Sequence, residues 1–245
     1  MSANMSSRMA YVRSFIANTT SIPTLDKEIY EIFGICLGDG CLSKYYSNYD
    51  NAIKYEVKFT GNSKDDLEYY QNFLLPTLKS KFNIKLSYRI RKDCNAINMN
   101  INNKQVFMFF KNLGMPIGDK KNKIKLPKKI FNSTSDVKAS VLRGLLDTDG
   151  CIFARKDEGY KYLHLEIASG TLGFLLQLKK LIRQFGMPAY VHWTEGHGGN
   201  VLIRGNKNIK IWMDKIGTSH PIIKGRYLKW LKAGILLPKG LVAQR

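Results

Sequence analysis

The stretch Val141-Leu-Arg-Gly-Leu-Leu-Asp-Thr-Asp-Gly150 has a near copy, Glu31-Ile-Phe-Gly-Ile-Cys-Leu-Gly-Asp-Gly40, earlier in the chain. Subtracting 39 from 149 puts the last aspartates of the two copies 110 residues apart. At that offset the central glycines, the last aspartates and the closing glycines all coincide. The chain therefore contains an internal repeat.

Each copy predicts an apolar helix that ends in an aspartate and a glycine. The small residues Gly34 and Gly38 are four apart, as are Gly144 and Thr148, and this spacing lets two helices approach closely. If the helices pack in parallel, Asp39 and Asp149 emerge side by side at one end, where two carboxylates repel each other. Mg²⁺ relieves that repulsion, because it takes few carboxylates and keeps water or phosphate oxygens as its other ligands. The alternative is that both aspartates only close helix ends in turns. Duplication of the whole element favours the metal site.

Through these residues the chain resembles the LAGLIDADG homing endonucleases, in the single-chain form with two motif copies. The second copy, residues 142–150, follows the family pattern closely, whereas the first, residues 32–40, departs from it at Leu37 and Gly38. The resemblance implies a monomeric, site-specific endonuclease that makes Mg²⁺-dependent double-strand cuts in a long asymmetric DNA site. Mn²⁺ is expected to substitute for Mg²⁺, and Ca²⁺ to support binding without cutting. The implied metal site consists of Asp39 and Asp149, with Gly38 and Thr148 beside them.

The composition indicates a polyanionic partner. The 245 residues include 39 Lys and Arg but only 19 Asp and Glu, which gives a formal net charge of +20. With 44% hydrophobic residues and no apolar run near the length of a membrane span, the sequence favours nucleic acid over lipid as that partner. The four cysteines, Cys36, Cys41, Cys94 and Cys151, lack the spacing of a zinc site or a disulfide framework. No obligate protein partner is indicated.

We expect an intracellular protein that acts where its DNA lies. Residues 1–25 contain no acidic residue and two arginines, which weakly resembles a mitochondrial presequence. A basic tail is the favoured alternative, so a mitochondrial location stays open.

The pattern of apolar residues predicts an α+β fold of two pseudo-symmetric α-β-β-α-β-β-α halves that pack through the motif helices. The expected divisions are a tail at 1–23, a first half at 24–126 and a second half at 127–245. Thr24 is the expected cap of the first motif helix. The first-half strands are expected at 41–48, 53–60, 84–91 and 97–102, with helices at 64–82 and 103–114. The second-half strands are expected at 151–156, 160–168, 188–194 and 200–204, with helices at 171–185 and 206–217.

Each half should form an antiparallel sheet with one face covered by helices, and the two bare faces should form a saddle that binds DNA. In the first half the candidate DNA-binding residues are Lys44, Lys54, Glu56, Lys58, Lys85, Ser87, Arg89, Arg91, Asn98 and Asn100. In the second half they are Arg155, Tyr162, His164, Glu166, Tyr190, His192, Thr194 and Arg204. The alternative is a pair of solvated outer faces, but such faces would normally carry more acids.

The resemblance also points to catalytic lysines shortly before the helix that leads into the next motif. Lys123 and Lys125 are the first candidates, ahead of Lys120 and Lys121, and Lys224 is the candidate in the second half, ahead of Arg226. The alternative for each lysine is a plain phosphate contact. Relatives carry glutamine or another polar residue at the positions of Gly61 and Ser169. Asp147 is predicted to have a helix-end role, and His197 is assigned no chemistry.

Two other functions use the same scaffold. One is an RNA-splicing maturase that holds an intron with its basic surface. The other is a DNA-binding regulator that has lost cleavage. Because both Asp39 and Asp149 are present, the sequence favours the endonuclease.

Overall fold

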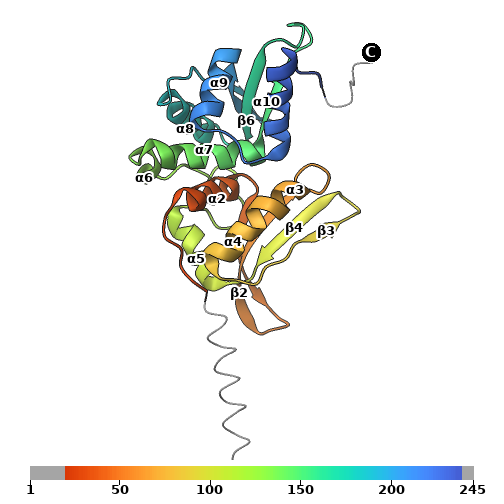
Figure 1. The fold of residues 1–245 in the computed structure, drawn as a ribbon. Coiled ribbons are helices and arrows are strands. Elements are labelled where there is room, and N and C mark those ends of the chain that lie inside the picture. The colour runs from red at the N-terminus through yellow and green to blue at the C-terminus, as the bar shows by residue number, and fades with distance from the viewer. Residues whose placement is uncertain (1–19, 239–245) are drawn as a thin grey trace, which may run out of the picture.

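A computed structural model describes residues 20–238, and two halves of the chain meet in it at a central pair of helices (Figure 1). These are the two motif helices, α2 (Lys27–Gly38) and α7 (Ser135–Asp149). The side chain of Asp26 caps α2 by accepting a hydrogen bond of 2.9 Å from the Ile29 backbone N–H. Thr24, the expected cap, therefore lies outside the helix. Thr134 caps α7 in the same way.

Each half contains one four-stranded sheet, and both sheets have the same strand order and only antiparallel pairs. The first sheet has the order β1-β2-β4-β3 and the second has the order β5-β6-β8-β7. The first-half strands are β1 (Gly40–Ser47), β2 (Ala52–Asn62), β3 (Arg89–Arg91) and β4 (Ala96–Ile101). The second-half strands are β5 (Gly150–Ala154), β6 (Leu163–Ser169), β7 (Tyr190–Thr194) and β8 (Gly198–Arg204). The predicted α+β class with two repeated halves is confirmed.

The remaining helices pack on the sheets, on one another or on α7. They are α3 (Leu67–Tyr69), the π-helical turn η1 (Tyr70–Leu74), α4 (Leu75–Phe82), α5 (Lys104–Leu113), α6 (Lys128–Phe131), α8 (Leu172–Arg183), α9 (Asn206–Lys215) and α10 (Pro221–Ala233). The helix expected at 64–82 is thus α3, η1 and α4 in succession. Pro76 follows the π-helical turn, where a widened turn accommodates a residue that has no N–H to donate. No helix among residues 20–238 is long and apolar enough to cross a membrane.

Two predicted strands are shorter than expected. Only residues 89–91 of the stretch 84–91 pair with β4, so Lys85 and Ser87 precede the sheet. Leu86 between them is buried against the core of the first half, which takes this segment away from the sheet edge. Strand β6 begins at Leu163, which leaves Tyr162 outside it. Helix α10 was not predicted.

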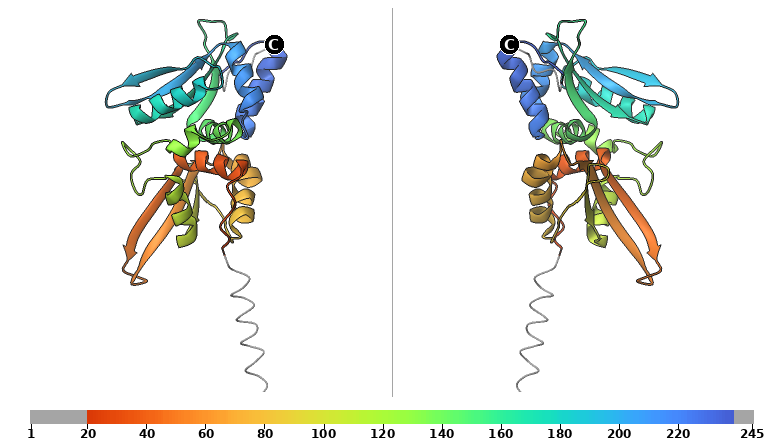
Figure 2. Two further views of the ribbon diagram at one scale, coloured as in Figure 1. Left: turned by 90° about the vertical axis from the view of Figure 1, so that its left-hand side faces the viewer. Right: turned by 90° about the vertical axis from the view of Figure 1, so that its right-hand side faces the viewer.

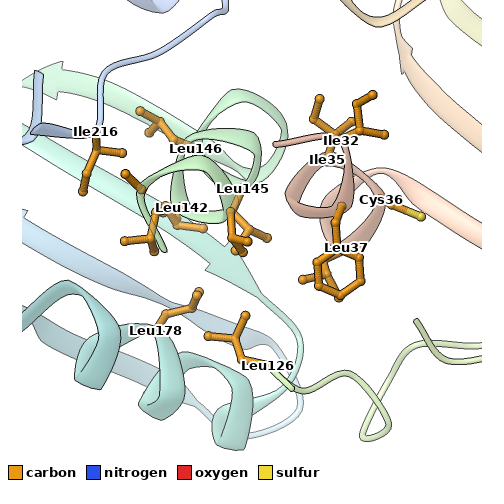
Figure 3. Packing of buried hydrophobic residues seen from close by; sticks show 14 of the residues in the cluster. Ile32, Ile35, Cys36, Leu37, Leu126, Leu142, Leu145, Leu146, Leu178 and Ile216 are labelled. Carbon is orange, nitrogen blue, oxygen red and sulfur yellow. The ribbon is translucent and has the colours of Figure 1, made fainter. Parts of the chain in front are cut away.

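The two halves share one buried hydrophobic cluster around α2 and α7 (Figure 3). At the crossing, a Cβ on Gly34 would clash with the carbonyl oxygen of Val141, and a Cβ on Gly144 would clash with that of Glu31. Glu31 and Val141 are themselves equivalent positions of the repeat, so the contact obeys the pseudo-two-fold symmetry of the sequence. Arg143 Nη1 also bridges the helices through an ion pair of 2.8 Å with the buried carboxylate of Glu31.

Candidate active site

The structure brings Asp39 and Asp149 together at the C-terminal ends of the two motif helices. Asp39 is the C-cap of α2, where its N–H donates to the Ile35 carbonyl at 2.9 Å, and Asp149 is the last residue of α7. A Cβ on Gly38 would lie 3.1 Å from Asp149 Oδ2, so the second carboxylate touches the backbone just before the first. The side-by-side arrangement follows from the close approach of the helices at their glycines.

The surroundings of both carboxylates disfavour negative charge. Burial, together with the charges of Asp149 and Asp66, raises the pKa of Asp39 to about 7, and the charge of Lys120 opposes this shift. Desolvation also raises the pKa of Asp149 above its ordinary value, although its side chain remains accessible, and Lys120 again opposes the shift. Acidic groups whose charged forms are disfavoured are typical of sites that receive a cation.

Lys120 is the lysine that reaches this pair. Its Nζ donates to the Leu37 carbonyl at 3.0 Å and to the Gly38 carbonyl, at the negative end of the α2 dipole. The linker runs along β1, where the Gly118 N–H donates to the Leu42 carbonyl at 2.7 Å, and this path delivers Lys120 to the end of α2. The sequence ranked Lys120 behind Lys123 because the spacing along the chain does not reveal that path.

Lys121 also lines the cavity beside Asp149, whereas the remaining candidate lysines lie elsewhere. Lys123 and Lys125 are exposed, and neither lines the cavity beside Asp149. Lys224 is exposed in the first turn of α10. Arg226, ranked behind it, donates from Nε to the Ile152 carbonyl at 2.8 Å and so fastens α10 to β5.

A cavity of about 800 Å³ opens beside Asp149. Its walls are the end of α2, the linker at 120–124, the end of β6 and the hairpin between β7 and β8. Lys120, Ser169 and Thr171 line it, and His197 and Glu195 lie on its hairpin side. No sequence pattern connects His197 with the motif. The connection arises because β8 begins opposite the end of β6, with Gly199 paired to Ser169.

The site fits a hard divalent cation that keeps several non-protein ligands. Among residues 20–238, no group of three or more His, Cys, Asp or Glu side chains is placed to hold a metal. The available oxygens are the carboxylates of Asp39 and Asp149 and the Gly38 carbonyl, which already accepts from a cation, Lys120. The Thr148 hydroxyl donates to the Gly144 carbonyl at 3.0 Å, so its hydrogen is used within α7. Such a set suits Mg²⁺ with water or phosphate oxygens.

Asp147 has the helix-end role that was predicted for it. It is buried at the end of α7 and accepts hydrogen bonds from the Thr218 hydroxyl and, at 2.9 Å, from the Ser219 N–H. The hydroxyl of Tyr69, in the first half, donates to it at 3.4 Å. Asp147 therefore holds the start of α10 and the first half against α7.

Most first-sheet candidates lie on the face of the sheet that the core does not cover. The strand register places Lys54, Glu56, Lys58, Arg89, Arg91, Asn98 and Asn100 there. Lys44 is a correction, because it pairs with Tyr55, whose ring packs edge-on against Phe107 of α5. The Lys44 Nζ lies 5.8 Å from the centre of the Tyr55 ring, on the helix-covered side.

The second sheet presents an equivalent open face. The register places Glu166, Tyr190, His192, Thr194 and Arg204 on it, and Arg155 is exposed just after β5. His164 is a correction, since its ring is buried, stacks on Phe153 at 5.2 Å and contacts Glu158 Oε2 at 2.7 Å. A covered imidazole cannot contact a base. The β1–β2 and β7–β8 ribbons project from the two halves toward the same side of the molecule (Figure 2).

One polar pair recurs on both open faces. Asn100 donates to Glu56 Oε2 at 3.3 Å in the first sheet, and Asn200 donates to Glu166 Oε2 at 2.8 Å in the second. Each glutamate is thus held by an amide donor. The two pairs are not at equivalent positions of the repeat, because Lys58 and Glu166 are the residues that pair with the cysteine after each motif.

Comparison with known proteins identifies the same motif. Residues 136–217 match a LAGLIDADG-like domain. The chain has the LAGLIDADG fold. It resembles the homing endonuclease I-DmoI in complex with DNA and Ca, with 18% identity, a TM-score of 0.59 and coverage of 83% of this chain and 97% of that one. It also resembles the I-LtrWI LAGLIDADG homing endonuclease bound to target DNA, with 13% identity, a TM-score of 0.54 and coverage of 86% of this chain and 90% of that one.

The curated relatives are much longer than this chain. The chain is 27% identical over 198 residues to the ribonucleoside-diphosphate reductase NrdEB subunit alpha of Bacillus subtilis (strain 168), covering 76% of this chain but 17% of the relative. It is 25% identical over 198 residues to a glutamine–fructose-6-phosphate aminotransferase of Methanocaldococcus jannaschii, covering 78% of this chain and 16% of the relative. The similarity thus concerns a minor part of each relative.

Proposed function

We propose that the protein is a site-specific DNA endonuclease that cuts both strands of a long, asymmetric duplex site with the help of Mg²⁺. One observation carries the proposal: the paired carboxylates of Asp39 and Asp149 stand at the joined ends of the motif helices, beside a basic linker. The fold adds support, because I-DmoI and I-LtrWI are homing endonucleases and are described in complex with DNA.

A small number of groups would carry out the cleavage reaction. Asp39, Asp149 and the Gly38 carbonyl would hold the divalent cation, which supplies charge neutralisation and an activated water when bound. Lys120 stands beside them with a positive charge that can stabilise negative charge developing on a phosphate. Because the acids are related by the pseudo-two-fold axis between α2 and α7, each can serve one strand of a duplex. This geometry suits a double-strand cut.

The sheets would supply affinity and sequence recognition. A major groove admits a β-ribbon, in which arginine can read guanine and asparagine can read adenine, while lysines hold phosphates. Arg89, Arg91 and Asn98 fill these roles on the first sheet, and Arg204 and His192 face the groove on the second. Because the two open faces carry different side chains, the preferred site is asymmetric and one chain suffices to cover it. The acting form is therefore a monomer.

The second candidate is a maturase that binds intron RNA with the same basic surface. It needs the fold and the charge but not the carboxylate pair. Both acids are retained, which favours the endonuclease.

The test is selection of cleaved molecules from a randomised duplex library incubated with the full chain and Mg²⁺. The proposal expects enrichment of a single long site without two-fold symmetry, cut on both strands. Mn²⁺ should substitute for Mg²⁺, whereas Ca²⁺ should support binding without cutting. Failure to enrich any cleaved duplex, together with tight binding to structured RNA, would favour the maturase.

A further inference from the structure

Tyr70 carries a buried hydroxyl that the fold does not use. The side chain begins the π-helical turn η1, and the residue is only 2% exposed. Its hydroxyl oxygen is buried and has no hydrogen-bond partner among residues 20–238. Leaving a buried polar group unpaired is costly, and such groups are rare in folded proteins. The hydroxyl therefore calls for an explanation other than stability.

The ring of Tyr70 occupies the space that a side chain at position 61 would need. A Cβ on Gly61 would lie 2.7 Å from Cε2 and 3.0 Å from Cζ of Tyr70. The neighbouring residue of β2, Thr60, donates its N–H to the Asp39 carbonyl at 3.3 Å. Tyr70 thus reaches the Asp39 end of the site from the position that Gly61 leaves empty.

The charges of the site act on this hydroxyl. Burial raises the pKa of Tyr70 well above its usual value, and the charges of Asp39 and Asp66 raise it further. Asp66 is already held, because its Oδ2 accepts from the Asn62 N–H at 2.6 Å and its Oδ1 lies 3.1 Å from His220 Nε2. Within the described part of the chain, no hydrogen bond holds the carboxylate of Asp39, which is therefore the nearby acceptor.

The second half has a different residue at the position equivalent to Gly61. Lys58 pairs with Cys41 and Glu166 pairs with Cys151, so the registers make Gly61 and Ser169 equivalent. Ser169 lines the open cavity beside Asp149. The second half therefore offers a serine side chain on β6, whereas the first half offers a phenol from a helix.

We propose that Tyr70 is a positioning residue for one of the two cuts, whose hydroxyl hydrogen-bonds a water molecule held at Asp39. Ser169 has the corresponding place beside Asp149. This inference rests on the proposed endonuclease function and adds that the two strands are cut by non-equivalent pockets. No bond is made or broken by Tyr70 itself, because it only holds the water in place.

Tyr70→Phe keeps the ring beside Gly61 and removes only the hydroxyl. Tyr69→Phe is the matched control, because Tyr69 is an equally buried neighbour whose hydroxyl donates to Asp147. Single-turnover cleavage is followed with each DNA strand labelled separately. We expect Tyr70→Phe to slow one strand by about tenfold or more while the other changes by less than about twofold. Tyr69→Phe should show no strand preference.

Two further measurements separate a positioning role from a structural one. The melting temperature should stay the same or rise in Tyr70→Phe, because an unpaired buried hydroxyl is lost, and should fall in Tyr69→Phe. The Ca²⁺ concentration that gives half of the maximal rise in melting temperature should increase by about threefold or more only in Tyr70→Phe. An unchanged Ca²⁺ midpoint in Tyr70→Phe, or equal slowing of both strands, would overturn the inference. If the parent protein cuts neither strand, the proposed endonuclease function fails, and the Ca²⁺ measurement still decides the role of Tyr70.

Discussion

Gly34 and Gly144 lie with their backbones in direct contact, such that a Cβ on Gly34 would be 3.1 Å from the Cα of Gly144. No other residue type permits this approach, because any side chain would enter the backbone of the facing helix. The contact fixes the separation of α2 and α7, and with it the distance between the helix ends. The geometry of the proposed metal site is therefore set by glycines a turn or more away from the carboxylates.

Gly144→Ala should destabilise the protein by about 2–3 kcal/mol, the cost of overpacking a tight core. The added methyl group would clash with the Glu31 carbonyl and lie 2.7 Å from the Ile35 backbone nitrogen, so a helix must move. Denaturant unfolding measures the change. Gly173→Ala is the control, since Gly173 lies in α8 and has no atom within 4 Å of the added Cβ. That variant should be stabilised by about 0.5–1 kcal/mol. Equal effects at the two positions would contradict the proposed helix contact.

The repeat was the part of the fold that the sequence predicted best. Helix spacing, paired glycines and strand alternation are local signals, and they placed α2, α7, α5 and most strands correctly. Asn103 and Gly114 bounded α5 as expected, because a side-chain cap and a left-handed glycine are chemically specific. Long-range packing decided the rest. Leu86 is buried in the core instead of lying in the predicted strand, and Phe153 and Glu158 cover the ring of His164.

The free energy of unfolding should depend on pH through Asp39. Burial raises the pKa of Asp39 in the folded state to about 7 from an ordinary value of 3.8, so the folded protein retains a proton that the unfolded chain loses between these pH values. Stability from this group therefore falls as pH rises through that window. Asp39→Asn cannot ionise, and in buffer with a chelator it should be more stable than the parent by about 1–3 kcal/mol above pH 7. Below pH 4 the advantage should vanish.

The stabilities of Asp39→Asn and the parent protein are compared by thermal or denaturant unfolding from pH 4 to pH 8. Asp93→Asn is the control, because Asp93 is exposed and forms a surface ion pair with Arg91 at 2.6 Å. Its replacement should change stability little at any pH. A difference between Asp39→Asn and the parent that stays constant with pH would show that Asp39 does not titrate near neutrality.

Lys120→Met should slow DNA cleavage by about 10²–10³-fold, the loss typical of one preorganised charged donor. DNA affinity in Ca²⁺ should change by only a few-fold, because one lysine makes a small part of the basic surface. Lys123→Met, which removes an exposed lysine of the same linker, should leave the cleavage rate near that of the parent. Single-turnover rates at saturating protein separate the two variants. The opposite ranking would restore Lys123 as the catalytic lysine and remove Lys120.

The affinity for DNA should depend strongly on salt. The formal charge of +20 and the basic open faces indicate many phosphate contacts. With about six to ten phosphates neutralised, affinity should fall by about 10³–10⁵ between 50 and 200 mM salt. Fluorescence anisotropy with labelled duplex in Ca²⁺ provides the measurement. A nearly flat salt response would contradict the two-sheet binding surface.

Only part of the candidate site could be predicted from the sequence. Asp39 and Asp149 were found because the motif repeats, and the chemistry of paired carboxylates follows from their spacing. Lys120, His197 and Tyr70 come to the site through the linker path, a strand register and a π-helical turn, none of which has a local sequence signal. The sequence shows that Gly61 lacks the polar side chain that relatives carry at this position. The residue that occupies the space, Tyr70, is nine positions further along the chain.

Asp149→Asn tests the central claim most directly, because it removes one charge from the carboxylate pair while keeping the shape of the side chain. On the duplex selected by the parent protein, we predict that double-strand cleavage in Mg²⁺ is lost and that binding in Ca²⁺ remains measurable. If Asp149→Asn cuts both strands at the parental rate, the paired carboxylates do not form the site of cleavage.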